Sequence, residues 1–271
     1  MQKSKKLYHL HIPRTSGTGI LYAINNSFKI HKSKTNTNSF KPPEIFQFVY
    51  DHDVMQFWPL ISGHFAINPI IENKENIDVF SIVRNPIDHF ISIAAYRAMS
   101  SQEQFDNLFL DKFIEGEYDL PIGCDLFSSR GNLQTKMLTC KSVSIAQFMG
   151  EEFIKGRKDK SIKYGIWFVN SDMPKNQKEL IEKIKTFKLF EINQRKEINK
   201  YLKYQLKEKF DVDFIQLNDF EKTNSSVRNN VKPSPLQEKE ILKRNEMDLI
   251  LYEYVQSRTN KHPEQQHEQN I

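Results

Sequence analysis

The sequence predicts an α/β fold in which a central, mostly parallel sheet is flanked by helices. Short apolar segments alternate with longer segments of helical periodicity, and two of the apolar segments are each followed by a polar loop and a helix start. The 271 residues are 38% hydrophobic and 12% aromatic, which is enough to build one core. We therefore predict a single domain over residues 1–258 and a disordered tail over residues 259–271.

The first strand is predicted over residues 7–12, an apolar and aromatic run that ends at Pro13. A loop of small polar residues follows it and leads into a helical segment over residues 20–24. Residues 36–43 are predicted to be loop, and a short strand within residues 57–65 ends near Gly63. These elements form a strand, loop and helix followed by a second strand.

The clearest strand is predicted over residues 77–83, a nearly continuous apolar run typical of a buried parallel strand. Pro86 suits the first turn of a following helix. In that helix the apolar residues recur at helical spacing, which predicts a stripe that packs on the sheet: Ile87, Phe90, Ile91 and Ala94.

Periodicity alone predicts the remaining elements. Residues 101–156 read as mostly helical with a break at 121–123, and residues 163–169 as a further strand. Residues 177–210 predict two lysine-rich amphipathic helices, residues 214–217 a short strand, and residues 236–255 one final helix.

The loop after the first strand reads His11-Ile12-Pro13-Arg14-Thr15-Ser16-Gly17-Thr18. A small-residue loop between a strand and a helix presents backbone N–H groups to an anion, and Arg14, Thr15 and Thr18 add side-chain donors. No Lys follows Gly17, so the pattern of an ATP-binding P-loop is absent. The loop is therefore interpreted as a phosphate cradle, with a tight turn that binds nothing as the alternative.

A second candidate anion site follows the strand at 77–83. Arg84 closes that strand, and Ser92 lies eight residues later on the following helix, away from the apolar stripe. A guanidinium and a hydroxyl together can clamp a phosphate. The alternative is that Arg84, Asn85 and Pro86 only mark the start of a helix.

These two motifs, in this order, resemble the donor-binding motifs of sulfotransferases that use 3′-phosphoadenosine 5′-phosphosulfate (PAPS), in the carbohydrate, heparan sulfate 2-O-sulfotransferase-like and bacterial-type branch. Segments at 62–65, 132–138 and 235–252 also resemble that branch. Arg14 stands where the family usually has Lys, and His89 stands where many relatives have Arg. Because Arg and Lys are not equivalent donors, the first departure bears on the donor geometry.

The resemblance implies a P-loop-NTPase-like fold and transfer of a sulfuryl group from PAPS to an acceptor hydroxyl on a carbohydrate such as a polysaccharide or glycolipid. It implies that Arg14 stabilises the leaving 5′-phosphate, that Arg84 and Ser92 bind the 3′-phosphate, and that no metal is required. The donor-binding residues that it implies are Pro13, Arg14, Thr15, Ser16, Gly17, Thr18, Arg84, Ser92, Thr223, Asn224 and Ser226. For the last three residues, a solvated loop is the alternative.

A histidine is well suited to accept the proton of the acceptor hydroxyl, because its ordinary pKa is close to neutrality. His64 follows Gly63 and matches the position of the family's catalytic His, so the resemblance implies that His64 is the base. His11 lies in the first strand, and His89 lies on the helix after the second motif.

Charge and composition narrow the classes of function. The net charge of +5 is too mild to indicate wholesale nucleic-acid binding, and no stretch is apolar enough to span a membrane, so a cytoplasmic location is expected. The two cysteines, Cys124 and Cys140, form no disulfide framework. Two alternatives remain: a nucleotide or small-molecule kinase that uses ATP and Mg²⁺, and a non-catalytic protein that binds phosphoadenosine or nucleic acid.

Overall fold

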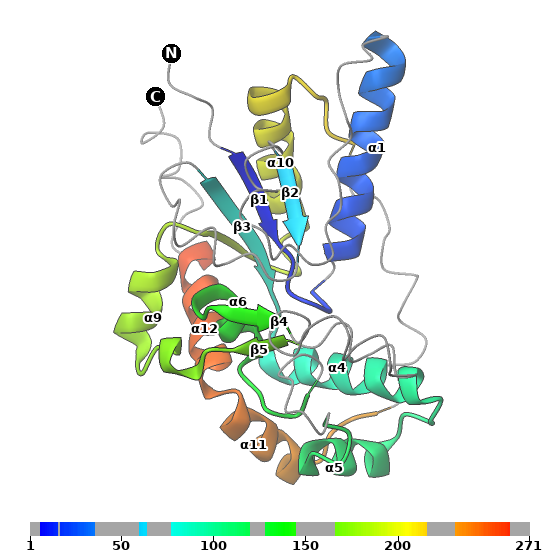
Figure 1. Cartoon of the computed structure of the whole chain (residues 1–271), viewed down its shortest axis with the longest axis vertical. Coiled ribbons are helices and arrows are strands. Elements are labelled where there is room, and N and C mark those ends of the chain that lie inside the picture. The colour runs from blue at the N-terminus through cyan, green and yellow to red at the C-terminus, as the bar shows by residue number, and fades with distance from the viewer. Residues whose placement is uncertain are drawn as a thin grey trace.

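A central four-stranded parallel sheet organises the chain (Figure 1). The computed structural model describes residues 6–15, 17–35, 60–63, 77–119, 128–144, 166–215 and 231–260. The strands β1 (Lys6–Leu10), β2 (Leu60–Gly63), β3 (Ile77–Val83) and β6 (Lys188–Glu191) lie in the order β2-β1-β3-β6. The predicted α/β class, with a parallel sheet flanked by helices, is confirmed.

Side chains alternate between the two faces of β1 and β3, as the period of an extended strand requires. Tyr8 and Val79 belong to one buried cluster, whereas Leu7 and Phe80 belong to the other. Both strands are therefore buried on both faces, which explains why residues 77–83 read as a nearly unbroken apolar run.

Helices α1 (Gly17–Thr35) and α10 (Arg195–Phe210) cover one face of the sheet (Figure 1). Their buried side chains pack at helical spacing against the face that carries Phe80. These side chains are Ile20, Ile24 and Phe28 from α1 and Ile198, Leu202, Leu206 and Phe210 from α10.

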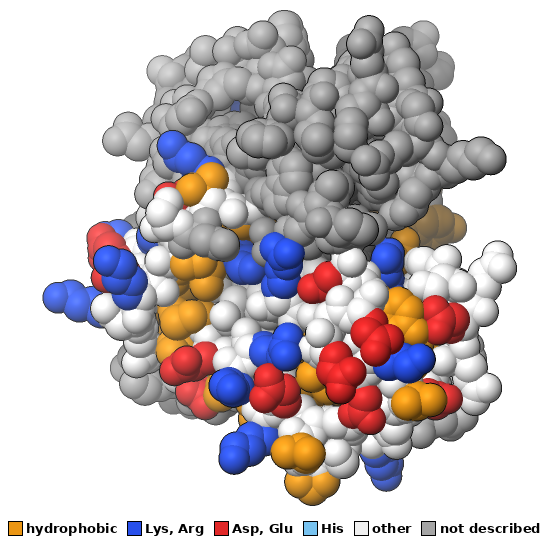
Figure 2. Space-filling view, turned by 60° about the horizontal axis from the view of Figure 1, so that its bottom comes forward, with side chains coloured by type: hydrophobic (Ala, Val, Ile, Leu, Met, Phe, Trp, Pro, Cys, Tyr) orange, Lys and Arg blue, Asp and Glu red, His pale blue; other side chains and the backbone are white. Residues whose placement is uncertain are grey.

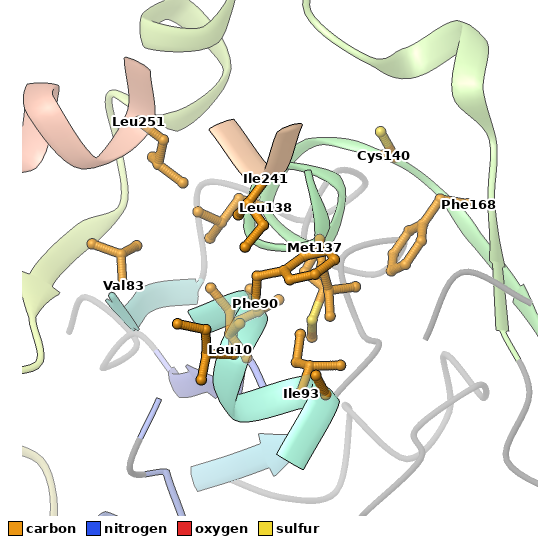
Figure 3. Close-up of a cluster of buried hydrophobic side chains, with 14 of the residues drawn as sticks. Leu10, Val83, Phe90, Ile93, Met137, Leu138, Cys140, Phe168, Ile241 and Leu251 are labelled. Carbon is orange, nitrogen blue, oxygen red and sulfur yellow. The ribbon is translucent and has the colours of Figure 1, made fainter. Parts of the chain in front are cut away.

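The opposite face is covered by α4 (Pro86–Ser101), α6 (Leu133–Thr139), α9 (Gln177–Ile184) and α12 (Glu246–Asn260). Helices α5 (Asn107–Glu115) and α11 (Pro235–Arg244) pack against α4. Figure 3 shows Leu10 and Val83 from the strands gathered with Phe90 of α4 and Leu138 of α6. The carboxyl ends of β1 and β3 are thus anchored in this core.

Two expectations for the middle of the chain need correction. Ser142–Ser144, expected to be helical, forms β4, which pairs antiparallel with β5 (Ile166–Phe168) outside the central sheet. A short 3₁₀ turn, η3 (Asn170–Asp172), follows β5. The strand expected near 163–169 is confirmed as β5. Strand β4 was not predicted because three residues are too few to show the alternation of apolar and polar side chains typical of a strand. The predicted break at 121–123 lies outside the described residues.

The region expected to hold two lysine-rich helices also contains the edge strand β6 between α9 and α10. Strand β6 has only four residues, and Phe190 is the one that is buried. The sequence of this strand therefore shows no alternation of apolar and polar residues from which it could have been predicted. Phe214 and Ile215, expected to begin a strand, have no regular secondary structure.

The single helix predicted over residues 236–255 is two helices, α11 and α12, separated at Asn245. The Asn245 Nδ2 group donates to the Ile241 carbonyl at 2.8 Å, and its Oδ1 accepts from the Asn132 N–H at 2.9 Å. The bond to Asn132 ties the break to a segment 113 positions away, so the helical period alone could not reveal it. Residues 259 and 260, predicted to start the tail, continue α12.

The surface below α4, α5 and α11 mixes acidic, basic and hydrophobic side chains, as Figure 2 shows. Leu108 of α5 and Leu236 of α11 are exposed. No helix within the described ranges combines the length and the apolar character that crossing a bilayer requires.

Candidate functional site

The order of the strands directs attention to the carboxyl ends of β1 and β3. These two strands are parallel neighbours, but the chain leaves β1 towards β2 on one side and leaves β3 towards β6 on the other. In open α/β sheets ligands bind at such a switch point, outside the carboxyl ends of the strands. Arg14 and Arg84, both predicted from the sequence, follow these two ends.

The loop after β1 turns sharply at Arg14, whose φ of 65° lies in the left-handed region. Residues other than Gly rarely adopt this backbone conformation, and those that do concentrate at functional sites. The buried Thr15 hydroxyl donates to the Ile12 carbonyl at 2.7 Å, which holds the turn together. Helix α1 then begins at Gly17, so a helix N-terminus directly follows the loop.

The structure brings the two predicted motifs into direct contact. The Arg14 Nε–H group donates to Ser92 Oγ at 3.1 Å, and the Arg14 guanidinium lies 5.3 Å from the centre of the Tyr96 ring. Neither partner carries a negative charge, so these two contacts orient the guanidinium without neutralising it. Residues 78 positions apart in the sequence therefore meet at the switch point.

His89 makes the third contact between α4 and this loop. Its Nε2 atom lies 2.9 Å from the Pro13 carbonyl oxygen, and because a carbonyl can only accept, Nε2 is the donor. His89, Ser92 and Tyr96 follow one another at i, i+3 and i+7, which places them along one side of α4. The sequence motifs identified Ser92, whereas the contacts of His89 and Tyr96 follow only from the packing of α4 against the loop.

His11, another histidine near the loop, is buried in a row of rings. Its ring stacks on His9 with centroids 5.5 Å apart, and His9 stacks on Phe80 at 4.7 Å. This row belongs to the sheet face covered by α1 and α10. The side chains of His11 and His89 thus both pack within the fold.

The segment after β3 starts a well-capped helix. The Asn85 side chain accepts from the N–H of Ile87 at 3.0 Å and from that of Asp88 at 3.4 Å, and Pro86 occupies the first turn of α4. The prediction of a helix start at this point is confirmed. Arg84, immediately before the cap, is half-buried.

Gln134 of α6 holds the backbone of Arg84 with both ends of its amide. The Arg84 N–H donates to Gln134 Oε1 at 2.8 Å, and Gln134 Nε2 donates to the Arg84 carbonyl at 2.9 Å. Gln134 is fully buried. The sequence comparison included its segment, 132–138, but indicated no function for it, because the contact joins residues 50 positions apart.

The start of α6 is in turn fixed by the start of α12. Asp248 accepts from the N–H of Gln134 at 3.2 Å and from that of Thr135 at 2.7 Å. Asn132 Oδ1 accepts from the Met247 N–H at 2.9 Å, so each helix supplies a cap for the other. Burial raises the pKa of the Asp248 carboxyl above its ordinary value, although the N–H groups of Thr135 and Gln134 act in the opposite direction.

Gly131 permits this close approach of the two segments. A Cβ at this position would lie 2.1 Å from the Arg244 carbonyl oxygen, and the φ of Gly131 is +75°. Any side chain here would separate α6 from the junction of α11 and α12. The segments 132–138 and 235–252, noted separately in the sequence, therefore form one structural unit behind Arg84.

An acidic group lies at the end of β6, the strand next to β3. Glu191 pairs with Val83 and accepts from the Tyr252 hydroxyl at 2.8 Å. Burial, together with this hydrogen bond, raises the pKa of Tyr252 to about 12, so the phenol stays protonated at neutral pH.

Within the described residues, no cluster of three or more His, Cys, Asp or Glu side chains is placed to hold a metal ion.

Several predicted site residues lie outside the described residues: Ser16, His64, Thr223, Asn224 and Ser226. Strand β2 ends at Gly63, which pairs with Leu10. Gly17 and Thr18 are described as the first residues of α1. The roles predicted for all of these residues stay predictions.

No protein-family model matches this chain, and no curated protein matches its sequence. Among solved structures, the chain is similar to the crystal structure of a sulfotransferase from Alicyclobacillus acidocaldarius. The two are 10% identical, the similarity covers 93% of this chain and 96% of that one, and the TM-score is 0.45.

Proposed function

We propose that this chain transfers a sulfuryl group from PAPS to an acceptor hydroxyl and releases adenosine 3′,5′-bisphosphate. The contact between Arg14 and Ser92 at the switch point carries this proposal, because it joins the two motifs that would bind the two ends of the donor. Adjacent strands lie about 4.8 Å apart, so basic residues after β1 and β3 suit one ligand with two anionic groups. PAPS is such a ligand, because it carries a phosphosulfate at its 5′ position and a phosphate at its 3′ position.

In the proposed reaction the acceptor oxygen attacks sulfur while the bond from sulfur to the oxygen of the 5′-phosphate breaks. The negative charge that develops on that phosphate is stabilised by Arg14 and by backbone N–H groups at the start of α1. His64 takes the proton of the acceptor hydroxyl. Pro13 and Thr15 shape the loop, since the Pro13 carbonyl and the Thr15 hydroxyl are engaged in holding it.

Arg84 and Ser92 bind the 3′-phosphate in this proposal. Charged hydrogen bonds from a guanidinium are strong, and a half-buried position strengthens them further. Thr223, Asn224 and Ser226 complete the donor site. The motif resemblance supports an acceptor of carbohydrate type, such as a polysaccharide or a glycolipid.

Thermal unfolding in the presence of different ligands tests the donor. Adenosine 3′,5′-bisphosphate at about 100 times its dissociation constant should stabilise the fold by about 2.7 kcal/mol and raise Tm by roughly 5–10 °C. Adenosine 5′-phosphate, which lacks the 3′-phosphate, is the matched control and should give a smaller shift. A larger shift with ATP and Mg²⁺ would indicate a kinase, and one with an oligonucleotide would indicate nucleic-acid binding.

Turnover by a His64→Ala variant tests the base. Loss of a general base should slow sulfuryl transfer by about 10²–10⁴-fold, while the affinity for adenosine 3′,5′-bisphosphate stays unchanged. The readout is the mass gain of candidate glycans incubated with PAPS. His262→Ala, in the C-terminal segment, is the control and should retain full activity. Full activity in the His64 variant would exclude His64 as the base.

A further inference from the structure

We infer that Gln134 is a positioning residue for the donor's 3′-phosphate, acting through the backbone of Arg84. This inference rests on the proposed function, because it requires Arg84 to bind that phosphate. Gln134 itself is buried beneath Arg84 and would not touch the ligand.

The geometry of the contact resembles one more step of strand pairing. The last residue of β3, Val83, pairs with Glu191 of β6, and regular pairing ends there. At the next residue, Gln134 supplies an acceptor to the Arg84 N–H and a donor to the Arg84 carbonyl. One side-chain amide therefore satisfies both backbone groups and fixes the direction in which Arg84 leaves the sheet.

Gln134 can hold Arg84 in place because its own backbone is fixed. Asp248 of α12 accepts from the N–H groups of Gln134 and Thr135, and Asn132 accepts from the N–H group of Met247 in the same turn of α12. All of these bonds are buried or partly buried, where polar contacts are strong and their loss is costly. The position of Arg84 thus depends on α6 and α12, which lie on the sheet face opposite α1.

This arrangement predicts a selective effect on binding. The loop that would hold the 5′ end is oriented by α4 through His89, Ser92 and Tyr96, and none of these contacts involves Gln134. Disturbing Gln134 should therefore weaken the grip on the 3′-phosphate and leave the 5′ end largely unaffected. A residue needed only for folding would weaken both ends equally.

The test is calorimetric binding of two ligands to a Gln134→Met variant, which keeps the side-chain length but forms neither hydrogen bond. We expect the dissociation constant for adenosine 3′,5′-bisphosphate to rise about tenfold, a coupling typical of residues in contact, and that for adenosine 5′-phosphate to change by less than about twofold. In an Arg84→Ala background the Gln134 substitution should have no further effect on either ligand.

Gln237→Met is the matched control. Gln237 is also a buried Gln that bonds to backbone and side chain: it accepts from the Ser234 N–H at 2.7 Å and donates to Asp111 Oδ1 at 2.8 Å. It lies on α11 and contacts no predicted donor-binding residue through these bonds. Its substitution should lower Tm without changing the ratio of the two dissociation constants.

The outcomes separate the inference from the proposed function. If the unmodified protein binds both ligands equally, the proposed function is wrong. If it prefers the bisphosphate but Gln134→Met weakens the binding of both ligands equally, the inference is wrong. The inference is also wrong if Gln134→Met still weakens binding in the Arg84→Ala background. Should Gln134→Met fail to fold, Gln134→Asn keeps the amide but is one methylene shorter, so it cannot reach the two backbone groups of Arg84 with the same geometry. The preference for the bisphosphate should fall, and an unchanged ratio of the two dissociation constants would overturn the inference.

Discussion

The loop after β1 and the segment after β3 lie at neighbouring strand ends but are held in different ways. The loop after β1 contains a left-handed Arg14 and is held by single contacts from side chains of α4. The segment after β3 continues into a capped helix, and a buried amide binds both backbone groups of Arg84. The second segment is therefore preorganised by its backbone, whereas the first depends on the orientation of a few side chains.

This difference suits the two tasks that we propose. A 3′-phosphate is only bound, so a rigid site lowers the entropic cost of binding it. The 5′-phosphosulfate reacts, and charge moves onto the phosphate as the reaction proceeds. A loop that is held by side chains can adjust its contacts as that charge develops.

The largest expected effect comes from removing the guanidinium at the rigid site. Arg84→Ala should raise the dissociation constant for adenosine 3′,5′-bisphosphate by about 100-fold, because charged hydrogen bonds to a phosphate contribute about 1.5–3 kcal/mol. Isothermal titration calorimetry measures this directly. The exposed Arg130 provides the control, and Arg130→Ala should bind like the unmodified protein. An unchanged dissociation constant for the Arg84 variant would reject the proposed clamp.

The next effect tests the support behind the rigid site. Asp248→Asn should reduce the free energy of unfolding by about 1–2 kcal/mol at pH 7. The two N–H groups bind different carboxylate oxygens, and the amide nitrogen that replaces one of these oxygens cannot accept a hydrogen bond. Urea unfolding measures the loss. Asp213→Asn is the control, since Asp213 is exposed and its ion pair with Lys207 contributes little.

The pH dependence of that stability difference follows from burial. Burial raises the pKa of Asp248 in the folded state above its value in the unfolded chain. The folded state then binds this proton more tightly, so the stability of the unmodified protein relative to Asp248→Asn should increase as the pH falls through the raised pKa. Below the ordinary pKa of about 3.9 the difference should stop changing. A difference that shrinks on acidification would show that the N–H donors outweigh burial.

The smallest effect concerns the strained loop. Arg14→Ala and Arg14→Gly both remove the guanidinium, but only Gly adopts a positive φ without steric cost. The Gly variant should therefore be more stable than the Ala variant by about 0.5–1 kcal/mol in urea unfolding.

The same pair of substitutions at a helical position gives the control for this comparison. Lys203 is exposed on α10, and there the Gly variant should be the less stable one, by about 1 kcal/mol. If Ala were preferred at both positions, Arg14 would not be left-handed in solution, and the contrast between the two strand ends would lose its structural basis.

The sequence predicted much of the fold and part of the candidate site. Arg14, Arg84 and Ser92 were identified from motifs, and the structure places Arg14 against Ser92. Gln134 and His89 received no structural role from the sequence, because their function lies in contacts with the backbone of distant residues. Such contacts depend on where the backbone runs and leave no local pattern in the sequence.

The sequence by itself determined the elements with strong local signals. Strand β3 is an apolar run, and Asn85 with Pro86 marks the start of α4, because burial period and helix caps depend on neighbouring residues. Only the tertiary structure decided that β6 joins the sheet and that Asn245 divides the last helical segment. It also decided that α6 and α12 meet behind Arg84. These features depend on which distant segments pack together, and a local pattern encodes the need for a partner but not its identity.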